Sequence, residues 1–195
     1  MKLLFATGNE HKVIEAQKAL GEDVTLIMPK ELGFLGDIPE NGCTLEDNAE
    51  EKCRYLWNMF HESCFADDTG LEVEALNGAP GVYTARYGGE SKEPDANMNK
   101  LLHELSSITD ITKRKARFRT VVALIINDVL YKFEGVLNGY IALSKSGIQG
   151  FGYDPIFIPE GKNVTLAEIS LEEKNSISHR GKAMRALKVF LDKQK

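Results

Sequence analysis

Two long runs of β-branched and aromatic residues, separated by two turn-forming residues, constrain the fold of this chain more than any other feature. Residues 116–126 predict one long strand, Asn127-Asp128 predicts a tight turn, and residues 130–143 predict the returning strand. The remaining sequence alternates between short strand patterns and helical patterns, at residues 2–6, 10–20, 24–28, 45–60, 64–66, 95–105 and after Ser178. A long antiparallel hairpin inside an alternating α/β pattern predicts a mixed rather than an all-parallel sheet.

Length and composition indicate one globular domain, residues 1–195, with two lobes and no linker. The fractions of hydrophobic (43%) and charged (27%) residues exclude a disordered chain, a collagen-like fibre and a coiled coil. The longest apolar run, residues 121–126, is far shorter than the roughly 18 residues of a membrane-spanning helix. The N-terminal apolar stretch is too brief for a signal peptide, so we expect a cytoplasmic protein.

Charge and cysteine content narrow the class of ligand. The net charge of −5 argues against general binding to nucleic acid, because neutralising phosphates requires a basic face. A small polyphosphate can still bind at a local basic site or through a metal ion. The three cysteines, Cys43, Cys53 and Cys64, fit neither a zinc-ligand pattern nor a disulfide framework, so we expect reduced, half-buried apolar side chains.

The segment Thr7-Gly8-Asn9-Glu10-His11-Lys12 directly follows the first predicted strand and opens a helix. Free backbone N–H groups at a helix N-terminus attract anions, and Lys12 adds a positive charge within one helical turn. The segment is not a Walker A motif, which needs two glycines and a Lys-Ser/Thr pair. It predicts either a phosphate or carboxylate site or an ordinary helix cap with a solvated lysine.

Two adjacent carboxylates, Asp67 and Asp68, follow the strand predicted at residues 64–66, and Thr69-Gly70 completes a predicted break from that strand. Adjacent carboxylates at the end of a buried strand are costly to desolvate. Mg²⁺ would offset this cost, because it binds one or two carboxylates together with substrate phosphate oxygens. One carboxylate could instead orient or deprotonate water. The alternative interpretation is a turn with side-chain capping.

Two further segments combine glycine, aromatic and charged residues. In Gly150-Phe151-Gly152-Tyr153-Asp154-Pro155 the glycines allow close approach of a planar ligand, and the aromatic rings offer stacking faces. The alternative there is a bulge or hairpin corner with its aromatic rings in the core. The stretch Lys174-Asn175-Ser176-Ile177-Ser178-His179-Arg180 places cations at the start of the last predicted helix, where they oppose the helix dipole. That placement points to an anionic or carbonyl-bearing partner.

Five motifs, taken together and in order, resemble the noncanonical purine nucleoside triphosphate pyrophosphatases, the inosine triphosphatase family. They are Thr7-Gly8-Asn9…Lys12, Asp67-Asp68-Thr69-Gly70-Leu71, GAPGVYTARY at residues 78–87, residues 150–155 and residues 177–180. The resemblance covers about residues 2–191. It implies Mg²⁺-dependent hydrolysis of ITP, dITP and XTP to the nucleoside monophosphate and pyrophosphate, by a protein that is usually a homodimer. It also implies an elongated mixed β-sheet with flanking helices that form two lobes around a nucleotide cleft.

The resemblance further implies roles for individual residues. Asp68 would be the catalytic base and a metal ligand, and Glu40 a second metal ligand. Substrate-binding roles fall to Thr7, Gly8, Asn9, Glu10, His11, Lys12, Lys52, Thr69, Phe151, Gly152, Tyr153, Asp154, Lys174, His179 and Arg180. Glu10 departs from the family pattern, in which small or basic residues are common, so its carboxylate should point away from phosphate.

The implied hydrolysis gives the charged side chains separate roles. Lys12 and Lys52 would stabilise charge on the leaving pyrophosphate. Asp68 would accept the proton from water, and its titration would be coupled to that of Asp67.

Selection among purines would depend on a hydrogen-bond donor to the 6-carbonyl group, from His179, Arg180 or nearby backbone. Two other classes stay open: a related pyrophosphatase acting on pyrimidine or methylated nucleotides, and a nucleotide-binding module without catalysis.

Overall fold

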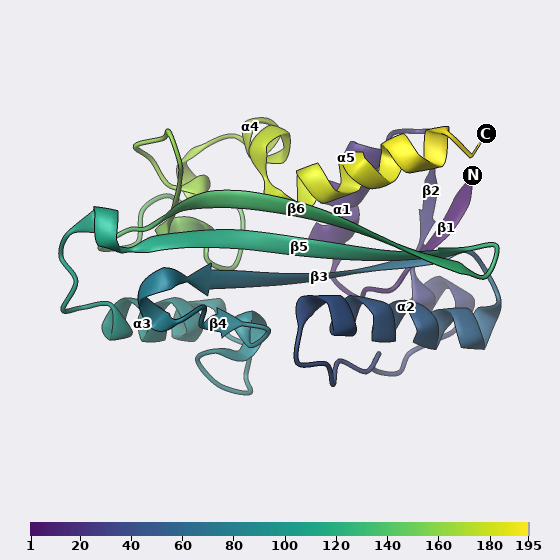
Figure 1. Cartoon of the computed structure of the whole chain (residues 1–195), viewed down its shortest axis with the longest axis horizontal. Coiled ribbons are helices and arrows are strands. Elements are labelled where there is room, and N and C mark those ends of the chain that lie inside the picture. The colour runs from purple at the N-terminus through teal and green to yellow at the C-terminus, as the bar shows by residue number, and fades with distance from the viewer. Residues whose placement is uncertain (195) are drawn as a thin grey trace. The chain divides into compact units, whose positions relative to one another are not determined.

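A computed structural model of the chain describes residues 1–194 and contains the predicted mixed sheet (Figure 1). Its strands are β1 (Lys2–Phe5), β2 (Thr25–Ile27), β3 (Cys64–Val73), β4 (Pro80–Gly81), β5 (Lys115–Ile126), β6 (Val129–Ile141) and β7 (Phe157–Pro159). Its α-helices are α1 (Glu10–Leu20), α2 (Leu45–Phe60), α3 (Pro94–Glu104), α4 (Leu171–Ile177) and α5 (His179–Asp192).

The sheet contains both parallel and antiparallel pairs. Its strand order is β2-β1-β3-β5-β6-β7, and β4 pairs with β3 beside this path. Strand β1 runs parallel to β2 and β3, whereas β4 is antiparallel to β3 and β7 is antiparallel to β6. The β5–β6 turn has positive φ angles at Asn127 (52°) and Asp128 (62°), as a two-residue hairpin requires. The predicted mixed α/β fold is therefore confirmed.

The chain divides into two compact units by its internal contacts. The first contains residues 1–69, 120–135 and 179–195, and the second contains residues 70–119 and 136–178. The single catalytic domain and the nucleotide cleft inferred from the sequence stay predictions.

In the first unit, side-chain alternation along the strands separates two packed faces. On one face, an apolar cluster joins the strands to α1 and α5. It contains the strand residues Leu3, Phe5, Phe65, Val122, Leu124 and Ile126, together with Ala16 and Leu20 of α1 and Ala183 and Leu187 of α5. The other face of β3 meets α2, where the Sγ atoms of Cys53 and Cys64 lie 3.7 Å apart. Figure 1 shows the same arrangement, with α1 and α5 on one side of these strands and α2 on the other.

The second unit packs around an apolar cluster of its own, which includes Leu71 and Val73 of β3, Phe118 of β5 and Leu101 of α3. Beside it lies the fully buried Arg114, which donates hydrogen bonds to the backbone carbonyls of Leu105, Ile108, Ile141 and Ala142. One guanidinium thus joins the end of α3 to the end of β6.

Two predictions from the sequence are corrected, and one short helix is additional to the predicted elements. Strand β3 does not break at Asp67-Asp68-Thr69-Gly70 but continues through them to Val73, because the buried carboxylates find cationic partners. The short helix α4 was not predicted from the sequence. The cysteines are not half-buried: Cys53 and Cys64 are fully buried, and Cys43 is exposed.

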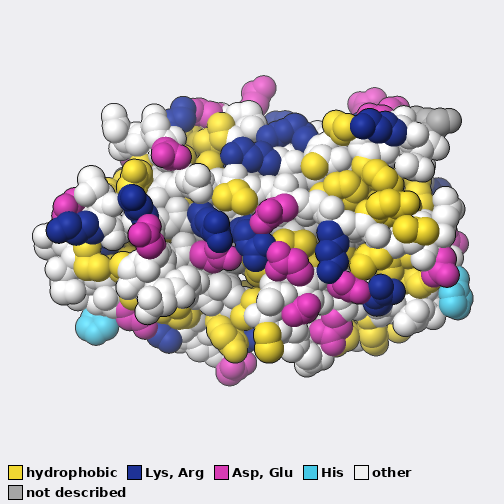
Figure 2. All heavy atoms as spheres, viewed as in Figure 1, with side chains coloured by type: hydrophobic (Ala, Val, Ile, Leu, Met, Phe, Trp, Pro, Cys, Tyr) yellow, Lys and Arg dark blue, Asp and Glu magenta, His cyan; other side chains and the backbone are white. Residues whose placement is uncertain are grey.

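Charged side chains of both signs mix on the face seen in Figure 2. In the first unit Glu50 pairs with Arg54 and Lys132, and in the second Glu72 pairs with Arg117 and Arg119. Within residues 1–194, no helix has both the length and the apolar character needed to cross a membrane.

Candidate active site

The two adjacent carboxylates point to opposite faces of β3, because successive side chains on a strand alternate. Asp67 shares the face of Phe65 and contacts Lys12 of α1 and Arg180 of α5. Asp68 lies on the opposite face, toward α2. Each carboxylate therefore has its own set of partners, and the two do not form one hydrogen-bonded dyad.

On the α2 face, Asp68 belongs to a cluster with Glu40 and Lys52. The Lys52 ammonium lies 2.5 Å from Glu40 Oε1 and 3.4 Å from Asp68 Oδ1. Burial opposes the charged form of Lys52, yet Asp68 and Glu40 together raise its pKa above the ordinary value. For Asp68 the balance is reversed: burial raises the pKa of its carboxyl group despite the nearby Lys52. This cluster brings together three residues that the sequence placed at one site.

On the opposite face, Asp67 is fully buried between two cations. Lys12 Nζ lies 2.9 Å from Asp67 Oδ1, and Arg180 Nε donates to Asp67 Oδ2 at 3.1 Å. Burial alone would raise the pKa of Asp67, but Lys12 and Arg180 lower it below its ordinary value. Asp67 is thus an ionised structural partner of the cations, which leaves Asp68 as the carboxyl group suited to accept a proton.

Arg180 is held on three sides within the first unit. Besides Asp67, its guanidinium donates from Nη1 to Glu15 Oε2 and from Nη2 to Thr69 Oγ1, the latter at 3.3 Å. Thr69 in turn lies 2.7 Å from Thr120 on β5, hydroxyl to hydroxyl. Burial disfavours the charged guanidinium, but Asp67 and Glu15 raise its pKa.

Sequence reasoning missed three residues of this site: Glu15, Asn48 and Thr120. Glu15 follows Lys12 by three positions on α1, and Asn48 precedes Lys52 by four on α2, so each shares a helix face with a predicted residue. That spacing was an available signal. Thr120 carried no comparable signal, because only strand pairing brings it to Thr69.

The Thr7–Lys12 segment forms a helix cap of its own. The side chain of Asn9 accepts hydrogen bonds from the backbone N–H groups of His11 and Lys12, and Thr7 Oγ1 accepts one from Asn9 N. Glu10 turns to the exposed Lys30, at 2.9 Å between side chains, and so leaves the N-terminal end of the helix. The helix cap is therefore present, but Lys12 is not a solvated lysine, because its side chain is 18% exposed and pairs with the buried Asp67. A phosphate-binding role for Thr7, Gly8 and Asn9 stays a prediction.

In the second unit, Asp154 organises the glycine-aromatic segment. Its Oδ2 accepts hydrogen bonds from Phe151 N (2.8 Å) and from Lys174 Nζ (2.7 Å), and Lys174 Nζ lies 4.5 Å from the centre of the Phe151 ring. Gly150 has a φ of 76°, and a Cβ at this position would lie 2.1 Å from Asp154 Oδ2, so only glycine fits. Predicted residues Phe151, Asp154 and Lys174 therefore do come together.

The aromatic residues of this segment differ in exposure. Tyr153 is buried in the core of the second unit and donates its hydroxyl hydrogen to Thr84 O at 2.9 Å. Phe151 is half-buried, and of the two rings it is the one accessible for stacking.

A groove of about 490 Å³ also opens in the second unit, over β3, β5 and β6. Charged and small residues line it, and none of them is a predicted site residue: Glu72, Val73, Glu74, Gly78, Lys115, Ala116, Arg117, Asn138, Gly139, Tyr140 and Glu160. The ion pairs of Glu72 with Arg117 and Arg119 satisfy much of its charge internally.

The donor set around Lys52 suits a divalent cation. Within residues 1–194 there is no cluster of three or more His, Cys, Asp or Glu side chains of the kind that forms an all-protein metal cage. Glu40 and Asp68, however, converge on one ammonium group. Two carboxylates completed by substrate phosphates are the ligands that Mg²⁺ prefers.

Comparison with known proteins gives a consistent result. The sequence model of the Ham1 family matches residues 3–190. A relative from Flavobacterium psychrophilum, named dITP/XTP pyrophosphatase, is 51% identical over 187 residues, which are 96% of this chain and 97% of the relative. A protein of the same name from Porphyromonas gingivalis is 50% identical over 190 residues, 97% of each chain.

Solved structures agree in fold. The Ham1 protein of Staphylococcus aureus superposes with a TM-score of 0.90 at 40% identity and covers 100% of both chains. A HAM1 protein from Coxiella burnetii gives a TM-score of 0.90 at 36% identity, with 99% of each chain covered. These matches confirm the resemblance inferred from the five motifs over nearly the whole chain. The chain therefore belongs to the Ham1 family.

Proposed function

We propose that this chain hydrolyses ITP, dITP and XTP to the nucleoside monophosphate and pyrophosphate, and so removes these nucleotides from the pool. The observation that carries the proposal is the Glu40–Lys52–Asp68 cluster, in which a largely buried proton acceptor and a buried cation meet a second, exposed carboxylate. Family membership and the dITP/XTP pyrophosphatase name of the relatives support the substrate class.

In the proposed mechanism, Asp68 removes a proton from the attacking water. Its side chain is only 14% exposed, and burial raises its pKa, which makes the carboxylate a stronger base than a solvated one. Lys52 lies beside it and would stabilise negative charge that develops on the phosphates.

Glu40 and Asp68 would hold Mg²⁺, which when bound would neutralise part of the triphosphate charge. The protein alone supplies no net positive charge there. In the ion-pair network of the first unit, Glu15, Glu40, Asp67 and Asp68 face Lys12, Lys52 and Arg180, so the carboxylates outnumber the cations within the described residues. A triphosphate would be repelled without a divalent cation.

Base selection would use a donor to the 6-carbonyl group of hypoxanthine or xanthine. Arg180 contacts Asp67, Glu15 and Thr69 with separate guanidinium nitrogens, and this favours a supporting role for it. The buried His179, or a backbone N–H near it, is then the better candidate for reading the base. The nucleotide contacts that the sequence implies for Phe151 and Lys174 stay predictions.

A substrate panel tests the proposal. Pyrophosphate release is measured from ITP, dITP, XTP, ATP, GTP, pyrimidine triphosphates and methylated nucleotides, with and without Mg²⁺. We expect kcat/KM to be highest for the first three and to require the metal. A preference for pyrimidine or methylated nucleotides would favour the related pyrophosphatase class, and binding without release would favour the noncatalytic module.

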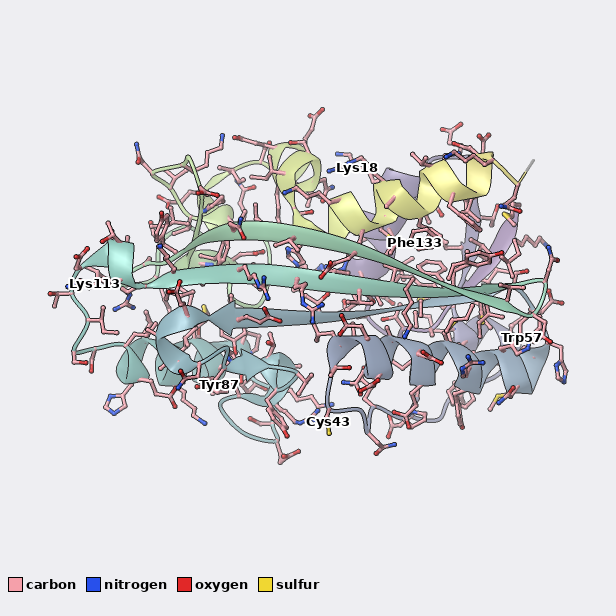
Figure 3. All side chains as sticks on the ribbon, viewed as in Figure 1. Lys18, Cys43, Trp57, Tyr87, Lys113 and Phe133 are labelled. Carbon is pink, nitrogen blue, oxygen red and sulfur yellow. The ribbon has the colours of Figure 1, made fainter. Side chains whose placement is uncertain are left out.

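We expect Lys12→Ala to weaken binding of a triphosphate by about 10-fold and binding of IMP by less than about twofold. The lost contact is a charge-assisted hydrogen bond to the outer phosphates, which the monophosphate lacks. Calorimetry with IMP and with an ITP analogue that resists hydrolysis measures both affinities. Lys18→Ala, at an exposed lysine on the same helix (Figure 3), is the matched control. Equal weakening of the two ligands would show that Lys12 does not contact the outer phosphates.

We also propose that the protein is a cytoplasmic homodimer. Analytical ultracentrifugation tests the homodimer, and a monomer at micromolar concentration would contradict it. Cell fractionation tests the cytoplasmic location.

A further inference from the structure

The segment that carries Glu40 is attached to α2 at three consecutive residues. Glu40 pairs with Lys52, the backbone N–H and side-chain amide of Asn41 donate to the Glu51 carboxylate (2.7 and 2.8 Å), and Gly42 N donates to Asn48 Oδ1 at 2.8 Å. Cys43, labelled in Figure 3, is the next residue and lies on the loop that leads into α2. The position of Glu40 is therefore set by side chains of α2.

Among these three side chains of α2, Asn48 is neutral and joins the Glu40 segment to Asp68. While its Oδ1 accepts from Gly42 N, its Nδ2 donates to Asp68 Oδ2 at 3.1 Å. The amide orientation follows from chemistry: Gly42 N–H can only donate, so the atom facing it must be the oxygen. Asn48 is buried, with 3% exposure, so water does not compete for either bond.

The two oxygens of Asp68 are thus held from one helix. Asn48 binds Oδ2 and Lys52, one turn further along α2, lies near Oδ1. Lys52 supplies charge, and Asn48 supplies direction, because a neutral N–H donor fixes the rotation of the carboxylate without adding charge. Close packing keeps the arrangement tight: a Cβ on Gly42 would lie 2.9 Å from both Asn48 N and Asn48 Oδ1.

We propose that Asn48 is a positioning residue for the hydrolysis, which orients the Asp68 carboxylate relative to Glu40. This inference rests on the proposed function, in which Asp68 accepts the proton. In this role Asn48 acts through Asp68, without itself contacting the reacting water or the nucleotide. Its loss should lower kcat with little change in nucleotide affinity, because the phosphate-binding cations remain in place.

Four variants test the proposal: Asn48→Ala, Asn48→Asp, Glu51→Ala and Asp68→Asn. Asn48→Ala removes both bonds. Asn48→Asp keeps the acceptor for Gly42 N–H but replaces the donor facing Asp68 with a carboxylate. Glu51→Ala detaches Asn41 from α2 without touching Asp68, so it is the matched control for loosening the segment.

At saturating Mg²⁺ we expect kcat for dITP to fall about 10-fold or more in both Asn48 variants, the size of a lost hydrogen bond to a charged group. We expect kcat to stay within about twofold in Glu51→Ala. Calorimetry with a dITP analogue that resists hydrolysis should give affinities within about threefold of wild type for Asn48→Ala and Glu51→Ala. A lower kcat with unchanged affinity and an unchanged melting curve indicates positioning. A merely structural role would instead show as a loss of folded protein in the melting curve.

Specific results would overturn the inference. If Glu51→Ala loses as much kcat as Asn48→Ala, the attachment of the segment matters and the bond to Asp68 does not. If Asn48→Asp, which matches asparagine in size, keeps wild-type kcat, the donor to Asp68 has no role, even where Asn48→Ala fails to fold. If Asp68→Asn stays active, the proposed function of Asp68 fails. If Asp68→Asn is inactive but both Asn48 variants keep wild-type kcat, the proposed function stands and only the positioning role of Asn48 fails.

Discussion

Asp68→Asn is expected to lower kcat at least about 100-fold, the lower end of the effect of removing a general base. The substitution keeps the shape of the side chain and its place beside Asn48 and Lys52, but it removes the charge and the basicity. Since Lys52 keeps its contact with Glu40, the fold should survive. Pyrophosphate release from dITP measures kcat, and a thermal melting curve reports the folded state.

Asp23→Asn is the control for this substitution, at a carboxylate that is 65% exposed and pairs only loosely with Lys188. It should retain full activity. A folded Asp68→Asn protein with kcat within tenfold of wild type would remove Asp68 from the role of base.

Arg180→Ala is expected to lower the free energy of unfolding by about 3–5 kcal/mol, because the buried carboxylates of Glu15 and Asp67 both lose their ion pair with the guanidinium, and Asp67 is left with Lys12. For a chain of this size that loss corresponds to a fall in Tm of roughly 6–20 °C. Urea denaturation measures the free energy, and calorimetry measures Tm. An unchanged Tm would mean that the buried network contributes little to stability.

The same position tests base selection, but through a variant that keeps the positive charge. In Arg180→Lys we expect kcat/KM for ITP and for ATP to decline in parallel, since the residue supports Asp67 and Thr69 rather than the base. A selective loss for ITP, with an ITP-to-ATP ratio that shrinks by roughly 10-fold or more, would instead assign the 6-carbonyl contact to Arg180.

Local features of the fold could be predicted from the sequence because they depend on neighbouring residues. The hairpin at Asn127-Asp128 has this origin. The course of β3 could not be predicted, because Asp and Gly favour turns locally. Lys12 and Arg180, 55 and 113 residues away from Asp67, override that preference.

In the candidate site too, some residues could be predicted from the sequence and others could not. The motifs indicated Asp68, Lys52 and Glu40, and the structure brings these three together. The motifs did not indicate Glu15 or Asn48, whose significance appears only when α1 meets α5 and when the Glu40 segment lies along α2. A buried polar side chain acquires its role from partners that are distant in the sequence.

The continuation of β3 through Asp67, Asp68 and Thr69 has a consequence for hydrogen exchange. On one side β3 pairs with β1 at Cys64 and Phe65 and with β4 at Leu71 and Glu72, and on the other it neighbours β5, so most of its backbone should exchange slowly even without nucleotide, apart from amides that point into the gap between β1 and β4. Glu40 and Asn41, by contrast, lie in an exposed segment outside any helix or strand. Protection gained on nucleotide binding should therefore concentrate around residues 38–44, where contacts with α2 already place Glu40 and a bound nucleotide would add to them.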